Sequence, residues 1–229
     1  MTTCENDGNA LDVDEKVWTV DVDRKGYSPT FVEQRDALAD AARSAHWDRV
    51  FQLLAHDKNW VNAPRLGSRS GYAPLHQAAW HGADTSVVER LLEAGAWRTL
   101  RTLEGARPVE ITLAHGHHGP VDLLTPDSTG FPEPAVTTDI QTYLHALITV
   151  RSRRYGCERV TWLPQVEPLL ELPHGCSLWC PIPGMYGGFA LRWDGGAVVA
   201  ESWSRIVSGS GQCHRVTADG VELVDDGIR

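Results

Sequence analysis

A motif that returns after 34 residues constrains this chain more than any other feature of its sequence. The segment G-Y-A-P-L-H-Q-A-A-W-H-G at 71–82 is followed by the run V-V-E-R-L-L-E-A-G-A at 87–96. The same frame returns as G-A-R-P-V-E-I-T-L-A-H-G at 105–116, followed by V-D-L-L at 121–124. A weaker copy precedes both, at a spacing of 37 residues from Ala41 to Ala78. Self-similarity at such a period indicates a repeat architecture.

The residue types in this frame suit pairs of short helices. Pro74 fixes φ in a first helical turn, where a backbone N–H is not needed. The alanine pair at 78–79 lets two helices approach closely, and the valine and leucine pairs at 87–92 place an apolar stripe on the second helix. Gly82 and Gly95 suit left-handed helix ends.

These residues resemble the ankyrin-repeat family, whose T-P-L-H-x-A-A hallmark is present as A-P-L-H-Q-A-A at 73–79. The resemblance covers roughly residues 36–126 and implies three repeats, with finger loops between helix pairs. It implies that His76 is a hydrogen-bonding staple between neighbouring loops. The third repeat has Glu110 at that position, and the loop at 62–71 is longer than a standard finger. Three repeats are about the minimum for a stable stack, so we expect the C-terminal region to cap them.

The sequence outside the repeats divides into three further parts. Residues 1–35 are expected to form an N-terminal arm with a short strand at 17–20, and residues 127–160 a linker and a helix that opens at Asp139. Arginines 151, 153 and 154 are interpreted as cations at the end of that helix. Residues 161–229 are rich in glycine, proline and β-formers, with strands expected at 177–182, 188–193, 197–206, 212–217 and 221–224.

The predicted fold class is therefore α+β: a three-repeat ankyrin helical array capped by a small antiparallel β-sheet domain. D-G-G at 194–196 and A-D-G at 218–220 are strong hairpin turns, so the strands should form a meander or a small half-barrel.

Charge and hydropathy argue against two classes of partner. The formal net charge is -9, whereas a nucleic-acid surface needs clustered lysine and arginine. No run of apolar residues approaches the ~18 that span a bilayer, and the acidic N-terminus lacks the features of a secretory signal. We expect a cytoplasmic protein that binds neither nucleic acid nor membrane.

Cofactor and metal signatures are absent from the sequence. No dinucleotide, phosphate-loop or metalloprotease fingerprint is present. Cys176 and Cys180 lack a second pair at zinc spacing, and the five cysteines are expected to be reduced. The H-G-H-H-G segment at 115–119 has no acidic or cysteine partner at a matching spacing, so we interpret it as structural. We predict no cofactor and no metal.

The densest polar and aromatic group lies in three C-terminal segments, at 179–189, 201–205 and 208–214. Alternate residues of a strand share a face, so Glu201, Trp203 and Arg205 should point together, as should Gln212 and His214 on a nearby strand. This predicts a polar pocket, the alternative being a surface salt bridge between Glu201 and Arg205 with Trp203 packed on the repeats. Gly187 and Gly188 favour either a close ligand or a bulge.

Trp80 and His81 close a repeat helix and are expected to face the same cleft. If the protein is an enzyme, His81 and His214 are the first candidates for a base, with Tyr186 as an acid. The predicted substrate-binding residues are Trp80, Trp179, Glu201, Trp203, Arg205 and Gln212.

The whole layout resembles a group of small stand-alone bacterial ankyrin-repeat proteins that carry P-G-M-Y-G-G-F, E-S-W-S-R and G-S-G-Q-x-H segments, present here at 183–189, 201–205 and 209–214. The resemblance implies a cofactor-free cyclisation enzyme of a polyketide pathway. Two hypotheses follow: a natural-product tailoring enzyme that performs dehydration, Michael-type addition or a related cyclisation of a small molecule, or a non-catalytic adaptor that grips a protein partner with finger loops 65–72.

Overall fold

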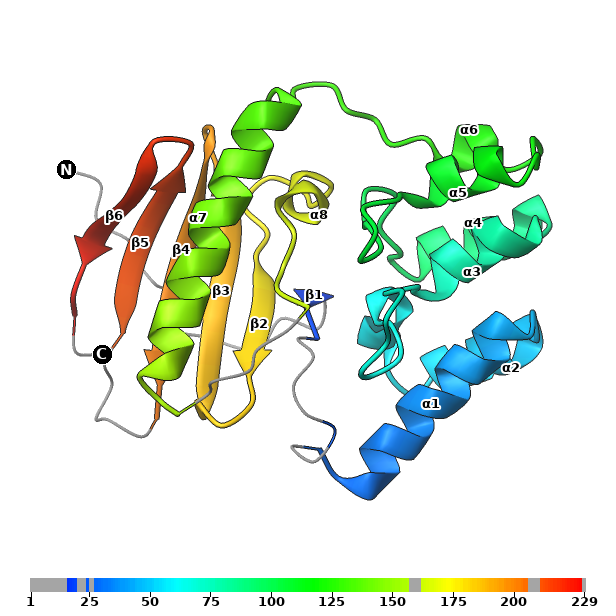
Figure 1. The fold of residues 1–229 in the computed structure, drawn as a ribbon, viewed down its shortest axis with the longest axis horizontal. Helices are drawn as coiled ribbons and strands as arrows, with labels where there is room; N and C mark the ends of the chain where they lie inside the picture. Colours follow the sequence, from blue (N-terminus) through cyan, green and yellow to red (C-terminus); the bar gives the residue numbers. More distant parts are fainter. Residues whose placement is uncertain (1–15, 20–23, 25–26, 157–161, 206–210, 228–229) are drawn as a thin grey trace.

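The computed structural model describes residues 16–19, 24, 27–156, 162–205 and 211–227. It consists of two lobes that lie side by side (Figure 1). The helical lobe contains α1 to α6, and the sheet lobe contains a six-stranded mixed sheet with α7 and α8. The expected α+β class is confirmed at this level. No helix among the described residues is long and apolar enough to cross a bilayer.

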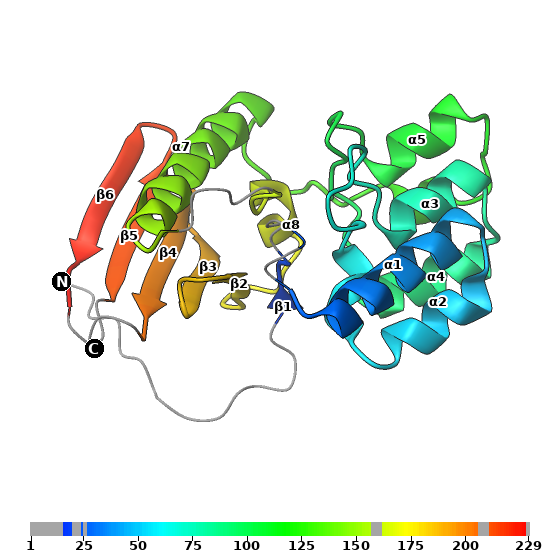
Figure 2. The same cartoon turned by 60° about the horizontal axis from the view of Figure 1, so that its bottom comes forward.

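The helical lobe is built from three helix–turn–helix pairs stacked on one another (Figure 2). Each first helix begins with a proline, and a left-handed Gly82 ends α3. The pairs are α1 (Pro29–Arg43) with α2 (Trp47–Leu54), α3 (Pro74–His81) with α4 (Thr85–Glu93), and α5 (Pro108–Ala114) with α6 (Val121–Leu124); a 3₁₀ helix, η2 (Lys58–Asn62), follows α2. The first pair begins within the expected N-terminal arm, because Ser28 caps α1 by accepting a hydrogen bond from Phe31 N–H.

The sheet has the order β1-β2-β3-β4-β5-β6. The last five strands form an antiparallel meander, as the sequence predicts, with the expected turns at 194–196 and 218–220. The expected end of the third of these strands at Ile206 lies outside the described residues. The strands are β1 (Lys16–Val17), β2 (Leu178–Ile182), β3 (Gly187–Asp194), β4 (Ala197–Ser204), β5 (Gln212–Thr217) and β6 (Gly220–Asp225).

The N-terminal strand β1 differs from the other strands because it runs parallel to its neighbour, β2. It also delivers Trp18, which is 2% exposed, into the core of the sheet lobe. This strand, Lys16–Val17, overlaps the expected strand at 17–20 only at Val17, and residue 20 lies outside the described residues. Because β1 pairs with β2, part of the expected N-terminal arm belongs to the sheet lobe.

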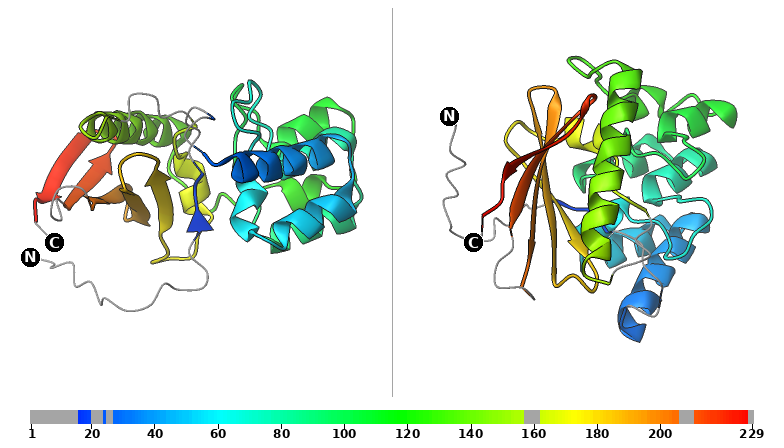
Figure 3. Two further views of the ribbon diagram at one scale, coloured as in Figure 1. Left: turned by 90° about the horizontal axis from the view of Figure 1, so that it is seen from below. Right: turned by 60° about the vertical axis from the view of Figure 1, so that its left-hand side comes forward.

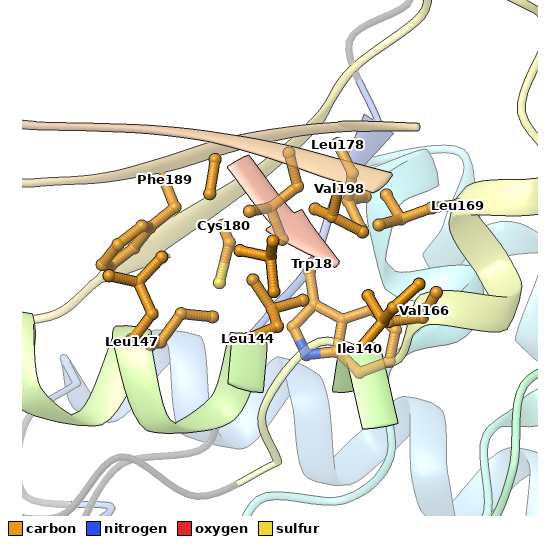
Figure 4. Close-up of a cluster of buried hydrophobic side chains, with 14 of the residues drawn as sticks. Trp18, Ile140, Leu144, Leu147, Val166, Leu169, Leu178, Cys180, Phe189 and Val198 are labelled. Atoms are coloured by element: carbon orange, nitrogen blue, oxygen red, sulfur yellow. The ribbon is translucent and has the colours of Figure 1, made fainter. Parts of the chain in front are cut away.

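Helix α7 (Pro134–Arg153) lies across one face of the sheet, which we call the inner face (Figure 3). An apolar stripe on α7, including Ile140, Leu144 and Leu147, packs with inward residues of the strands (Figure 4). The prediction that this helix opens at Asp139 is wrong: it begins at Pro134, a residue that suits a first turn. The interpretation of Arg151 as a helix-end cation is incomplete, because its side chain is buried against the sheet.

The two lobes are joined by a shared core. Trp18 stacks on Trp97 of the helical lobe and on Trp162 of the sheet lobe, with ring centroids 5.7 and 5.9 Å apart. The helix α8 (Val166–Leu170) adds polar contacts, since Glu167 accepts hydrogen bonds from Arg101 and Arg107.

The expected capping arrangement is therefore wrong in its geometry. The sheet lobe lies beside the loops that precede α3 and α5 rather than on the end of the helix stack (Figure 1). Those loops bring buried apolar groups, including Ala73 and Leu100, into contact with the sheet lobe. The sheet lobe packs on the side of the helix stack because this apolar surface lies there.

Candidate functional site

A pocket of about 480 Å³ lies between the lobes. This volume is typical of a small-molecule site. Its walls come from three parts of the chain: the N-terminal strand region, the helical lobe around α1 and η2, and the turn from β2 to β3. The lining residues are Val17, Thr19, Tyr27, Phe31, Asp57, Asn59, Trp60, Pro181, Ile182, Pro183, Gly184, Tyr186 and Gly187.

The wall from the helical lobe is aromatic and preorganised. Tyr27 and Phe31 stack with ring centroids 4.8 Å apart, and Trp60 meets Phe31 edge-on at 5.7 Å. Trp60 is 6% exposed, so the core of the lobe fixes its position. Such a wall offers apolar contact area with little conformational freedom left to lose on binding.

The polar groups of the pocket lie at the start of η2. Asp57 caps this helix, because its Oδ1 accepts a hydrogen bond from Asn59 N–H at 2.9 Å. Asn59 Oδ1 in turn accepts a hydrogen bond from Val17 N–H at 3.3 Å. Asn59 therefore ties β1 to the helical lobe and carries an amide group at the pocket wall.

The opposite wall is the turn between β2 and β3, which contains Tyr186. Tyr186 has a left-handed backbone with φ 51°, and its side chain is 70% exposed. The turn is held by β4: Ser204 Oγ donates to Met185 O at 2.6 Å, and Arg205 N–H donates to Tyr186 O at 3.2 Å. Tyr186 is the one predicted site residue that lines this pocket.

The sheet separates the other predicted site residues, contrary to the expectation of a single polar pocket. Glu201 pairs with Cys213 across β4 and β5, whereas His214 pairs with Ala200 and Gln212 with Ser202. Paired residues share a face and neighbours along a strand alternate. Glu201 therefore points to the outer face, and His214 to the inner one.

The outer-face residues form an aromatic cluster, and they do not line the pocket between the lobes. Trp179 and Trp203 stack with ring centroids 5.6 Å apart, and the Arg205 guanidinium lies 5.7 Å from the Trp203 ring. The structure contains no ion pair between Glu201 and Arg205, both of which lie in its described part. The alternative in which Trp203 packs on the repeats is also not observed, because its stacking partner is Trp179 of the same sheet.

On the inner face, His214 is buried beside Arg151 of α7. Burial lowers the pKa of His214, the positive charge of Arg151 lowers this pKa further, and Asp226 opposes the shift. Gln212 Nε2 donates to Asp226 Oδ1 at 2.7 Å. His214 and Gln212 therefore lie under the helix and not in the pocket between the lobes.

Trp80 and His81 do not face the sheet lobe, which corrects their predicted place in the cleft. They end α3, whose opposite end lies near the sheet lobe (Figure 1). His81 Nε2 donates to Arg43 O at 2.9 Å. Trp80 is 45% exposed, and the centroid of its ring lies 3.9 Å from that of the His115 ring. Their positions follow from helix length, since eight residues span about 12 Å.

His76 makes the contacts expected of a staple. It is fully buried, its Nδ1 accepts a hydrogen bond from Ala73 N–H at 3.2 Å, and its Nε2 donates to Leu100 O at 2.9 Å. Burial lowers its pKa to about 4, although its backbone hydrogen bonds favour the proton. Glu110 accepts a comparable bond from Arg107 N–H at 2.8 Å.

The paired glycines of β3 serve strand packing. A Cβ atom on Gly188 would lie 2.3 Å from Cys180 O, and one on Gly187 would lie 2.0 Å from Trp203 O. The close neighbours are the backbones of adjacent strands, and Gly187 also lines the pocket between the lobes. Cys180 is buried in the core, and burial raises the pKa of its thiol, which keeps it unreactive.

Finger loop 65–72 is engaged within the chain. Arg65 pairs with Asp40 of α1, and a Cβ atom on Gly71 would lie 2.6 Å from the Trp162 ring. Arg69 is exposed. Among the described residues, no group of three or more histidine, cysteine or acidic side chains could hold a metal ion.

Sequence reasoning missed most of the pocket. Tyr27, Phe31, Asp57 and Trp60 lie in segments assigned to the arm and the first repeat, and they meet the turn at 181–187 only in the folded chain. The one available signal is the aromatic pair four residues apart at 27 and 31, which has no place in the repeat frame.

The fold and the pocket define an α+β protein in which helix pairs and a mixed sheet enclose a small-molecule-sized site. No protein-family model matches the chain, and no curated protein matches it significantly.

Proposed function

We propose that this protein binds a small, largely apolar organic molecule between its lobes and converts it without a cofactor. The proposed reaction class is dehydration, Michael-type addition or a related cyclisation, as in natural-product tailoring. One observation carries the proposal: a pocket of about 480 Å³ with an aromatic wall on one side and Tyr186 on the other. A molecule of two or three fused rings has a suitable size for such a volume.

The titratable residues that line the pocket are Tyr27, Asp57 and Tyr186. We assign the base to Asp57, whose Oδ2 makes no hydrogen bond in the described part of the chain. We assign the acid to Tyr186, in agreement with the sequence-based expectation. An enolate-like intermediate needs a base and a hydrogen-bond donor, which these two groups supply. This assignment replaces His81 and His214 as candidates for the base.

We also propose that the helical lobe is an ankyrin array. Its support is the placement of three helix pairs at the repeat positions, the proline at the start of each first helix, and the loop-to-loop hydrogen bonds of His76. In this proposal the finger side of the array, where partners would bind, is covered by the sheet lobe of the same chain.

The alternative function is an adaptor that binds a protein partner through its finger loops. The internal contacts of Arg65 and Gly71 make it the weaker proposal, because those groups would have to exchange partners. Exposed Arg69 provides the test: Arg69→Glu should release a captured partner in pull-down if the adaptor function is correct. An unchanged partner list would count against it.

Binding is tested with the neutral apolar dye N-phenyl-1-naphthylamine, whose fluorescence rises in apolar sites. The wild-type protein should bind it saturably, and Tyr27→Ala should weaken binding about tenfold by removing one aromatic wall. Trp80→Ala, at an exposed tryptophan outside the pocket, is the matched control and should bind normally. Equal binding by wild type and Tyr27→Ala would refute the pocket as the site.

Catalysis is tested separately with β-hydroxy ketones and hydroxy-enones, the substrates of dehydration and of intramolecular Michael addition. Asp57→Asn and Tyr186→Phe should each lower turnover at least a hundredfold while leaving dye binding intact. The asparagine retains an oxygen that can cap η2. Full turnover in both variants would refute the assigned acid–base pair while leaving the binding proposal standing.

A further inference from the structure

A second group of polar side chains is buried between α7 and the inner face of the sheet. Arg151 and Ser152 end the sheet-facing stripe of α7 and are 6% and 0% exposed. Ser202 of β4 and His214 of β5 lie on the inner face of the sheet near Arg151 and are 2% and 8% exposed. Ser202 and His214 belong to the two sequence segments that the interlobe pocket does not use.

Several hydrogen-bonding groups in this cluster have no partner. Arg151 donates from one terminal nitrogen to Ser202 Oγ at 3.2 Å, and Ser202 Oγ donates to Gln212 O at 3.4 Å. Arg151 Nε, Ser152 Oγ and His214 Nδ1 are buried and make no hydrogen bond in the structure. Leaving such groups unsatisfied is unfavourable, and more so for a charged group.

The positive charge of the cluster is also uncompensated at close range. Arg151 forms no ion pair with any carboxylate in the described part of the chain. Asp226 acts on Arg151 and His214 electrostatically, but it is exposed and its Oδ1 already accepts a bond from Gln212. Tyr155 also favours the charged form of Arg151, whereas Arg154 adds a second positive charge. A buried cation without an ion pair is unfavourable, and an anion would relieve it.

We propose that Arg151, Ser152 and His214 form a second binding site, for an oxyanion such as a carboxylate or a phosphate group. Guanidinium Nε–H and a serine hydroxyl are suited to donate to neighbouring oxygens of such an anion. The Nδ1 tautomer of His214 supplies a further donor. The negative end of the α7 dipole opposes an anion, but this effect is smaller than the gain from pairing a buried guanidinium.

The site is separate from the interlobe pocket, so its test is independent of the proposed function. Calorimetric titration of the full chain with inorganic phosphate, and separately with acetate, at constant ionic strength should show saturable binding of one anion per chain. Thermal melts should show a rise in Tm that saturates with the same affinity. Tighter binding of phosphate identifies a phosphate site, and tighter binding of acetate identifies a carboxylate site.

Two variants and one control locate the binding. Arg151→Met keeps the length of the side chain without its charge and should lower anion affinity at least tenfold. His214→Gln is the second variant, in case Arg151→Met does not fold, and it should lower anion affinity about threefold. Arg153→Met removes an exposed cation two residues further along α7 and should bind as the wild type does. Absence of saturable binding in the wild type, or an equal loss in Arg153→Met, would overturn the proposal and indicate nonspecific charge screening.

Discussion

The indole of Trp18 lies nearly parallel to that of Trp97, with the two planes 11° apart and their centroids separated by 5.7 Å. Trp18 comes from the N-terminal strand and Trp97 from the helical lobe. The Trp18 indole N–H also donates to Trp162 O at 2.7 Å in the sheet lobe. One side chain from the N-terminal region thus joins both lobes, and its chain neighbours Val17 and Thr19 line the pocket between them.

Trp18→Ala should destabilise the whole protein as one unit. Loss of a buried tryptophan costs about 3–5 kcal/mol, and this one contacts both lobes. Urea unfolding followed by circular dichroism and by tryptophan fluorescence should give a single transition at a lower midpoint. The control is Trp80→Ala, which is 45% exposed and should cost less than about 1 kcal/mol. A change below 1 kcal/mol for Trp18→Ala would contradict the shared core.

Glu167→Gln should weaken the polar contact between α8 and the helical lobe. The Glu167 side chain is 14% exposed, and its carboxylate is 2.8 Å from Arg101 Nε and 2.7 Å from an Arg107 terminal nitrogen. Burial raises the pKa of Glu167, but the two arginines outweigh this and lower it overall. We expect a loss of about 1–3 kcal/mol in unfolding free energy. The control is Glu104→Gln, at an exposed glutamate in the loop that carries Arg101 and Arg107. An equal loss of unfolding free energy in this variant would argue against a specific contact of Glu167.

Stability should fall as the pH is lowered, in part through His76. Its pKa is about 4 in the folded state and 6.5 as the ordinary value, so the unfolded chain binds more protons between these two pH values. The contribution is fully present above pH 6.5 and is lost as the pH falls to about 4. Half-buried His145, whose pKa is also lowered by burial, acts in the same direction.

Because of this pKa shift, acidification from pH 7.5 to 4.5 should lower the unfolding free energy of the wild type by about 2–3 kcal/mol more than that of His76→Gln. Urea unfolding at both pH values measures the difference. His56→Gln, at an exposed histidine, should retain the pH dependence of the wild type. The same pH dependence in His76→Gln as in the wild type would show that His76 is not the group responsible.

Gly188→Ala should disturb the sheet beside the pocket. The new Cβ would lie 2.3 Å from Cys180 O and 2.8 Å from Pro181 Cα, so two strands must separate. We expect a loss of at least about 1–3 kcal/mol and weaker dye binding, because Pro181 lines the pocket. Gly119→Ala meets no atom within 4 Å and should change stability by less than about 0.5 kcal/mol. Thermal melts of both variants make this comparison.

Local sequence signals predicted the elements well where neighbouring residues decide them. Turn residues at 194–196 and 218–220 and the alternation between them placed the five strands of the meander, and proline and glycine placed the helices of the repeat frame. The start of α7 was missed, since Pro134 was interpreted as part of a linker although proline also opens helices. Tyr186 was the one candidate site residue placed in the pocket from sequence.

The chain's own sequence thus determined the helix pairs of the repeat frame and the strand order of the meander, because each depends on residues close in the chain or on a repeated frame. It did not predict η2 or α8, and the hydrogen-bonding role of His76 was implied by the family resemblance. Only the tertiary structure decided which candidate residues meet. Strand alternation put Glu201 and His214 on opposite faces, and helix length carried His81 away from the sheet. The pocket formed instead where Trp18 docks the N-terminal strand between two lobes, a long-range contact that apolar burial selects and local patterns do not encode.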